Sequence, residues 1–180
     1  MLKEELTVPL NLEMAATEEM LDIAVRTKPN AVCLVPEKRQ EITTEGGLNI
    51  EKYFDYLKDY IKIIKEQNIR VSLFLEPEIK MIDLAQKLQT DIIEFHTGRY
   101  CNLAADKRKQ EFDKIAVAVA YANSLNIECH AGHGLNYQSA AEISKIAAIK
   151  ELNIGHFLIG EAIFLGLNEA INKMKQAIKR

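Results

Sequence analysis

Two carboxylates stand inside short apolar runs of this 180-residue sequence. Glu13 lies in the run NLEMA, and Glu94 lies in the run DIIEFH. Burying an unpaired carboxylate is costly, so a buried one is usually paired with a cation, protonated or used in chemistry. We therefore expect acid–base chemistry at both residues, with a buried ion pair to a lysine or an arginine as the alternative.

The four histidines are a second set of residues that could carry chemistry. All of them lie at or near the ends of runs that we predict to be strands: His96, His130, His133 and His156. Catalytic residues of parallel barrels occupy such strand ends, because the loops that follow the strands meet there. Alternation along a strand puts Glu94 and His96 on one side, where a carboxylate and an imidazole could exchange protons. A hydrogen-bonded structural histidine is the alternative at each position.

Glycine-rich stretches follow the last two predicted strands. The stretch HAGHGLNY surrounds His133 with Gly132 and Gly134. Small residues let the backbone approach a ligand closely, and its free N–H groups can bind a phosphate. The stretch NIGHFLIG carries Gly155 and His156. Because turns also need glycine, each glycine taken alone indicates little, but together the two stretches favour a phosphate site.

A long polar loop, VPEKRQEITTEGG, follows the second predicted strand at residues 35–47. Its lysine, its arginine and its threonines, among them Thr43, could contact an anionic substrate if the loop closed over it. A solvated loop without any such role explains the composition equally well.

Strands and helices alternate along the chain and would position these residues. We predict strands at residues 8–15, 30–36, 69–76, 90–98, 126–134 and 152–160. We predict helices at residues 18–27, 50–67, 77–88, 106–125, 137–150 and 167–180. Strands that alternate with helices indicate a parallel sheet. Because no linker or shift in composition divides the chain, we expect one domain over residues 1–180.

Two architectures fit this alternation, an open doubly wound sheet and a (β/α)8 barrel. No GxGxxG motif follows the first predicted strand, so the sequence does not favour a dinucleotide-binding fold. The barrel has eight strand–helix units, whereas this sequence contains six predicted ones. The pattern alone therefore predicts an α/β fold and leaves its closure open.

Composition narrows the class of protein further. Apolar residues make up 48% and charged residues 27% of the chain, as in ordinary soluble domains. The net charge of −3, without a basic stripe, argues against nucleic acid as a partner. No apolar run approaches the ~20 residues that span a bilayer, and the first residues lack the apolar core of a signal peptide. We expect a cytoplasmic protein whose three cysteines are free thiols.

Five motifs together resemble the pyridoxine 5′-phosphate synthase family: NLEMA, CLVPEKRQEITTEGG, IEFHTG, AGHGLNY and ELNIGH. They occur in this order from about residue 9 to the C-terminus. The resemblance implies a TIM (β/α)8 barrel that condenses 1-deoxy-D-xylulose 5-phosphate with 3-amino-2-oxopropyl phosphate. The products are pyridoxine 5′-phosphate, phosphate and water. It also implies no metal or redox cofactor, no nucleic acid or membrane partner, and a homo-oligomer, which is an octamer in the family.

The same resemblance implies roles for individual residues. Glu13 corresponds to an acid–base catalyst, His133 to a proton donor and Glu94 to a residue that stabilises a transition state. Thr43 corresponds to a contact with the xylulose phosphate. The residues that correspond to contacts with the aminoketone phosphate are Gly134, Gly155 and His156.

Two departures from the family pattern affect these expectations. Family members begin with two further βα-units, which carry another acid–base histidine and several phosphate-binding groups, so we expect an incomplete barrel with about six βα-units. His130 stands where the family often has asparagine. The alternatives are a truncated, catalytically impaired member that serves at most as an assembly module, or another phosphate-binding barrel such as an isomerase or epimerase.

Overall fold

The computed structural model of the protein describes residues 2–36 and 46–179. The chain forms two compact units, Met1–Glu94 and Phe95–Arg180, and each is described by itself below. The boundary between them falls inside the fourth strand. The single domain expected over residues 1–180 remains a prediction.

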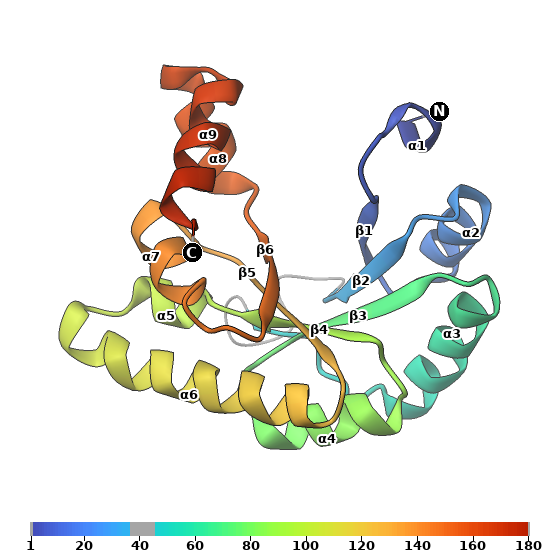
Figure 1. The fold of residues 1–180 in the computed structure, drawn as a ribbon. Helices are drawn as coiled ribbons and strands as arrows, with labels where there is room; N and C mark the ends of the chain where they lie inside the picture. Colours follow the sequence, from blue (N-terminus) through green and yellow to red (C-terminus); the bar gives the residue numbers. More distant parts are fainter. Residues whose placement is uncertain (1, 37–45, 180) are drawn as a thin grey trace. The chain divides into compact units, whose positions relative to one another are not determined.

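The described residues contain a six-stranded sheet whose strands follow one another in chain order. Figure 1 labels these strands and the helices between them. The strands are β1 (Asn11–Ala15), β2 (Ala31–Val35), β3 (Arg70–Leu75), β4 (Ile92–His96), β5 (Glu128–Gly132) and β6 (Ile149–Asn153). The pairs β1–β2, β2–β3 and β5–β6 are parallel. Parallel neighbours need a crossover connection, and helices between the strands supply it. The predicted α/β fold with six strand–helix units is therefore confirmed.

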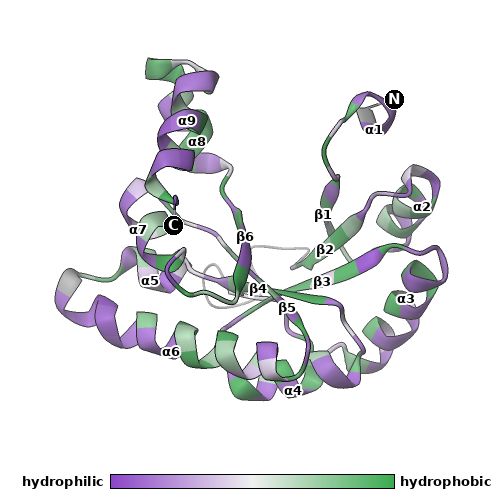
Figure 2. Ribbon diagram, in the orientation of Figure 1, coloured by the Kyte–Doolittle hydropathy of each residue, from purple (hydrophilic) through white to green (hydrophobic). Residues whose placement is uncertain are grey.

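In its described residues, the first unit contains four helices: α1 (Leu2–Glu5), α2 (Glu18–Thr27), α3 (Phe54–Glu66) and α4 (Ile79–Lys87). In this unit α2 packs against β1 and α3, and α3 packs against β3. Apolar and polar residues alternate along α3 in Figure 2, as its helical spacing predicts. The buried stripe of α3 consists of Leu57, Tyr60, Ile61 and Ile64.

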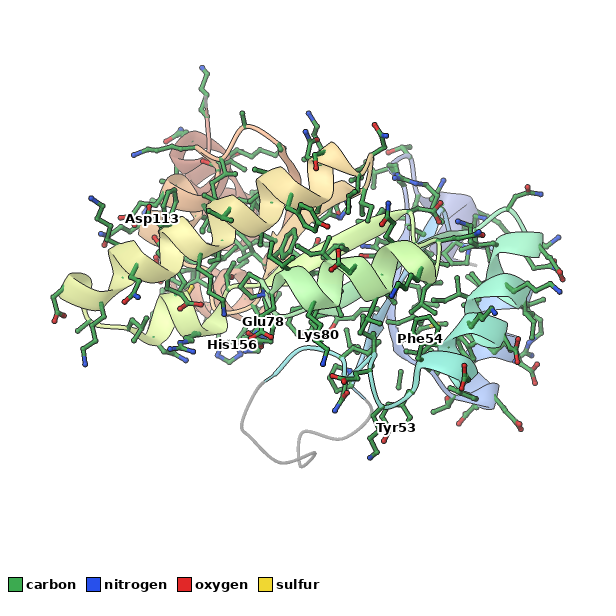
Figure 3. The ribbon with its side chains drawn as sticks, turned by 90° about the horizontal axis from the view of Figure 1, so that it is seen from below. Tyr53, Phe54, Glu78, Lys80, Asp113 and His156 are labelled. Atoms are coloured by element: carbon green, nitrogen blue, oxygen red, sulfur yellow. The ribbon has the colours of Figure 1, made fainter. Side chains whose placement is uncertain are left out.

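Polar contacts fix the ends of these helices. Thr17 caps α2, because its side-chain oxygen accepts a hydrogen bond from the Met20 N–H at 3.3 Å. Lys80 at the start of α4 forms an exposed ion pair of 2.7 Å with Glu51. Figure 3 labels Lys80 and also marks the beginning of α3 with Phe54. The first contact fixes the beginning of α2, and the second joins the start of α4 to the segment that precedes α3.

The register of β1, β2 and β3 sorts their residues into two rows. One row is apolar and buried, with Met14 beside Leu34 and Leu34 beside Leu73. The neighbouring row holds Glu13, Cys33 and Ser72. Successive residues on a strand point to opposite faces, so these two rows lie on opposite faces of the sheet. The sheet thus has a packed apolar face and a face that carries polar side chains.

As far as residue 179, the second unit contains the five helices α5 (Gly98–Asn102), α6 (Ala105–Ser124), α7 (Tyr137–Ile143), α8 (His156–Leu165) and α9 (Leu167–Ala177). Here α6 packs against α5 and β5, and α9 packs against α7 and α8. Cys129 is buried, and its thiol donates to the Val119 carbonyl of α6 at 3.6 Å. All three cysteines are free, as predicted.

The prediction of the last strand and the helix before it is wrong in position. The strand expected at residues 152–160 is β6, Ile149–Asn153, and α8 begins three residues after it at His156. A short apolar run such as HFLIG does not distinguish a strand from a helix, whereas the polar Lys150 and Glu151 concealed the real strand. Accordingly, the helix expected at residues 137–150 ends at Ile143.

None of the helices among the described residues combines the length and the apolar character that crossing a membrane requires.

Candidate active site

In the first unit, the polar row of the sheet brings predicted site residues into one line. Glu13 on β1 is the register partner of Cys33 on β2, which in turn is the partner of Ser72 on β3. The Cys33 thiol donates a hydrogen bond of 3.3 Å to the Glu94 Oε2 atom on β4. The row thus holds one side chain from each of β1, β2 and β3, and Glu94 of β4 contacts it through Cys33.

Cys33 acts in this row as a neutral hydrogen-bond donor. Burial raises the pKa of its thiol well above the ordinary value, and the Glu94 carboxylate beside it raises that pKa further. A thiol nucleophile needs a lowered pKa, so this environment opposes reactivity and favours a role in orienting the carboxylate. The sequence predicted only a free thiol here. One sequence feature could have indicated its place beside Glu13: Cys33 is the central residue of its strand, as Glu13 is of NLEMA.

The two predicted carboxylates differ in their surroundings. Glu94 is 5% exposed, which confirms the expectation of a buried acidic group, whereas Glu13 is exposed and that expectation is wrong for it. The physical reason lies in the strand order: β1 comes first, so Glu13 has its register partner on β2 alone. The Glu13 carboxylate is consequently accessible to a small molecule, and Glu94 is held by a buried partner.

In the second unit, His133 directly follows β5 in a tight turn. Its φ angle is +78° and that of Gly134 is +77°. Four other non-glycine residues in the described part of the chain have positive φ angles, but each of them follows a helix: Lys28, Asn68, Gln89 and Asn126. His133 instead follows a strand. This backbone conformation is unfavourable for residues with a Cβ atom and often occurs at functional sites.

His96, the last residue of β4, packs against His133 in the second unit. The two imidazole rings meet edge to face with centroids 5.0 Å apart. His96 is buried and His133 is exposed, so one ring forms a wall and the other ring is accessible. The proton exchange expected between Glu94 and His96 remains a prediction.

Gly98 and Gly134 let the backbone come close to these rings. A Cβ atom at Gly98 would lie 2.6 Å from His96 Nε2 and 2.9 Å from His133 Cδ2. At Gly134 a Cβ atom would lie 3.2 Å from the Cβ atom of Cys101, in addition to the positive φ angle. Space thus requires glycine at position 98, and the positive φ angle together with space favours glycine at position 134.

Gly155 and His156 lie at the N-terminus of α8. Gly155 precedes the first helical residue, its carbonyl accepts the Ile159 N–H at 3.0 Å, and both Gly155 and His156 are exposed. The N–H groups of a helix N-terminus attract anions. The strand predicted over these residues is therefore replaced by a helix end, which suits a phosphate contact at least as well.

One of the predicted substrate contacts is not placed by the structure. Thr43 lies outside the described residues. Among residues 2–36 and 46–179, no group of three or more histidine, cysteine or acidic side chains is arranged to hold a metal ion.

His130, whose role the sequence left open, belongs to a carboxylate cluster in the second unit. It is 4% exposed, and its Nε2 atom lies 2.8 Å from Glu128 Oε1 on the same strand. Its Nδ1 atom lies 3.6 Å from Glu151 Oε1 on β6, where Glu151 is its register partner. The cluster links β5 to β6, the two strands that precede the glycine-rich turns.

Solved structures similar to this chain define its fold class. The tryptophan synthase α-subunit of the hyperthermophile Pyrococcus furiosus superposes with a TM-score of 0.66 at 12% identity, covering 99% of this chain and 69% of that chain. A native KDPGal structure superposes with a TM-score of 0.60 at 10% identity, covering 99% and 73%. At such low identity the likeness concerns the fold alone. The chain is an α/β protein of the TIM-barrel type.

Sequence comparison gives the family. The family model of the pyridoxal phosphate biosynthesis protein PdxJ matches residues 1–180. The pyridoxine 5′-phosphate synthase of Ehrlichia canis (strain Jake) is 56% identical over 177 residues, which are 98% of this chain and 73% of the relative. That of Sulfurihydrogenibium sp. (strain YO3AOP1) is 51% identical over 175 residues, 97% of this chain and 72% of the relative. The chain belongs to the PdxJ family of pyridoxal phosphate biosynthesis proteins.

Proposed function

We propose that this chain acts as a pyridoxine 5′-phosphate synthase. It would condense 1-deoxy-D-xylulose 5-phosphate with 3-amino-2-oxopropyl phosphate and release phosphate and water. The observation that carries the proposal is the family match over residues 1–180, supported by relatives of more than 50% identity. Ring closure of this kind needs imine formation and several proton transfers. Acid–base side chains are the groups that such transfers require.

The proposed catalytic residues are Glu13, Glu94 and His133. The exposed Glu13 carboxylate suits proton transfer with a small substrate. Glu94, oriented by the Cys33 thiol at 3.3 Å, suits stabilisation of developing positive charge, since a preorganised group needs no rearrangement during reaction. His133, exposed on its tight turn, suits proton donation to a leaving group.

The proposed substrate contacts concern the two phosphate groups. Gly134 lies in the turn after β5, Gly155 directly precedes α8, and His156 begins this helix, where N–H groups favour an anion. These three residues would bind the aminoketone phosphate. Thr43, which lies outside the described residues, would contact the xylulose phosphate.

The test is formation of pyridoxine 5′-phosphate by the purified chain supplied with both substrates, followed by chromatography with fluorescence detection. The Ehrlichia canis relative serves as the reference enzyme. Glu13→Gln and His133→Asn should each lower the rate by about 10²-fold or more, the usual contribution of an acid–base group. Glu51→Gln, which alters an exposed carboxylate paired with Lys80, is the matched control and should leave the rate unchanged. Absence of product where the reference enzyme forms it would contradict the proposal.

We also propose that the protein is a homo-oligomer, as its family resemblance implies. The observation in favour is the apolar surface of α8, on which Ile163 is 78% and Phe164 is 85% exposed. An apolar surface of this kind is typical of protein–protein contacts. Light scattering coupled to size-exclusion chromatography measures the mass directly, and a monomer at all concentrations would exclude the oligomer. The cytoplasmic location remains a prediction.

A further inference from the structure

The turn that carries His133 has an unfavourable backbone, so something in the second unit must hold it. A non-glycine residue with a φ angle of +78° persists only when its surroundings compensate for the cost. Most of the contacts to this turn come from the sequence HTG at the end of β4, residues 96–98. These residues contact His133 from its ring side and from its carbonyl side.

Thr97 makes the carbonyl contacts. Its side chain is completely buried, and its Oγ1 atom lies 2.7 Å from the Gly132 carbonyl oxygen and 2.7 Å from the His133 carbonyl oxygen. The Thr97 backbone N–H also donates to the Gly132 carbonyl at 2.8 Å. The Gly132 carbonyl is thus held by the Thr97 N–H as well as by the hydroxyl, whereas the hydroxyl is the Thr97 group that reaches the His133 carbonyl.

His96 and Gly98, the neighbours of Thr97 in the sequence, lie next to the His133 ring. The His96 ring lies edge to face with it at 5.0 Å between centroids. The missing side chain of Gly98 leaves the space that both rings need, since a Cβ atom there would be 2.9 Å from His133 Cδ2. The Cys101 thiol approaches the His133 carbonyl at 3.9 Å, a weaker contact than that of the hydroxyl. Thr97 therefore combines complete burial with the shortest of the hydrogen bonds to this turn that the structure records.

We propose that Thr97 is a positioning residue, whose buried hydroxyl holds the His133 carbonyl and thereby orients the imidazole for proton donation. The proposal rests on the function proposed above for His133. Thr97 itself touches no substrate in this scheme. Its effect passes through the backbone of His133, so loss of the hydroxyl should change the turnover step more than substrate binding.

The experiment compares Thr97→Val, which keeps the branched shape and removes the hydroxyl, with Thr97→Ser, which keeps the hydroxyl. Thr97→Val should lower kcat by about tenfold, the effect of about one hydrogen bond, with KM changed less than twofold. Thr97→Ser should restore most of kcat. The pH profile of kcat should also shift in Thr97→Val, because the environment of the His133 imidazole changes with its orientation.

Thr90→Val is the matched control. Thr90 is also buried, and its hydroxyl donates to the Val71 carbonyl at 2.8 Å in the first unit. This variant loses a hydrogen bond of the same kind and should become less stable without a change in the pH profile. If Thr97→Val does not fold, Thr97→Ala takes its place in the same comparison with Thr97→Ser.

A second measurement separates this proposal from the proposed function. The C2 proton of the His133 imidazole, assigned with His133→Asn, is followed by NMR in the parent chain and in each variant. It should shift in Thr97→Val or Thr97→Ala and remain in place in Thr97→Ser and Thr90→Val. If the parent makes no product, the proposed function fails, whereas this signal still decides the role of Thr97. An unmoved signal in the variant that lacks the hydroxyl would overturn the proposal.

Discussion

Replacing Gly98 by alanine tests the packing of the two imidazole rings directly. Gly98 is not one of the described glycines that have a positive φ angle, so its backbone conformation allows a residue with a Cβ atom. The new atom would lie 2.6 Å from His96 Nε2 and 2.9 Å from His133 Cδ2. Ordinary contacts between heavy atoms need about 3.5 Å or more. At least one ring, or the start of α5, must therefore move by nearly the difference between these distances and the ordinary contact distance.

The size of the effect follows from this displacement. Overpacking a filled site costs typically about 1–3 kcal/mol. Since His96 is buried against its surroundings, the exposed His133 ring is the side chain that can yield. A displacement of about 1 Å in a catalytic group can lower a rate by about 10²-fold. We expect Gly98→Ala to lose stability by about 1–3 kcal/mol and turnover by about 10²-fold.

The assays are urea unfolding for the free energy of unfolding and product formation for turnover. Gly160→Ala is the matched control, because nothing lies within 4 Å of a Cβ atom there and the residue sits inside α8. Alanine is a better helix residue than glycine by about 1 kcal/mol, so this variant should gain stability. Parent-like stability and turnover in Gly98→Ala would refute the packing argument.

Three further predictions concern caps and titrating groups. Thr17→Ala should lower the free energy of unfolding by about 1 kcal/mol in urea, since it removes the cap of α2; an unchanged value would show that the cap is replaced by water. The hydrogen bond that Tyr100 donates to Glu142 lowers the pKa of that carboxyl, so the stability it contributes is present at neutral pH and lost as the pH falls below about 4.5. Unfolding measured from pH 7 to 3 should show a smaller loss in Tyr100→Phe, and an equal loss would contradict the assignment. Burial raises the pKa of the Cys33 thiol, so this thiol should react with a disulfide reagent at pH 8 only after the protein unfolds. The difference in reacted thiols between the parent and Cys33→Ala measures the reaction of Cys33.

The alternation of strands and helices could be predicted because its signals are local. The apolar spacing of α3 and the cap at Thr17 each depend on a few neighbouring residues, and the structure has both. The same reasoning failed for β6 and α8, where the strand is polar and the helix is apolar along nearly its whole length. There, the pairing of β6 with β5 overrides the local pattern.

The candidate site was predictable in its residue types and only partly in its surroundings. A carboxylate in an apolar run indicates burial, which holds for Glu94 and fails for Glu13, because the position of β1 in the strand order is not written in the run itself. The roles of Cys33 and Thr97 carried no sequence signal beyond their place in a strand or at its end. Both depend on which carboxylate or carbonyl another segment brings to them.

By itself, the sequence determined the six strand–helix units and, through its motifs, the family. Both predictions rest on short stretches of sequence, each of which can be recognised without knowledge of the rest of the fold. Only the tertiary structure decided that the Cys33 thiol donates to Glu94, 61 residues away, and that Thr97 donates to the His133 carbonyl, 36 residues away. Strand register and a left-handed turn create these contacts, and neither is a property of any one segment.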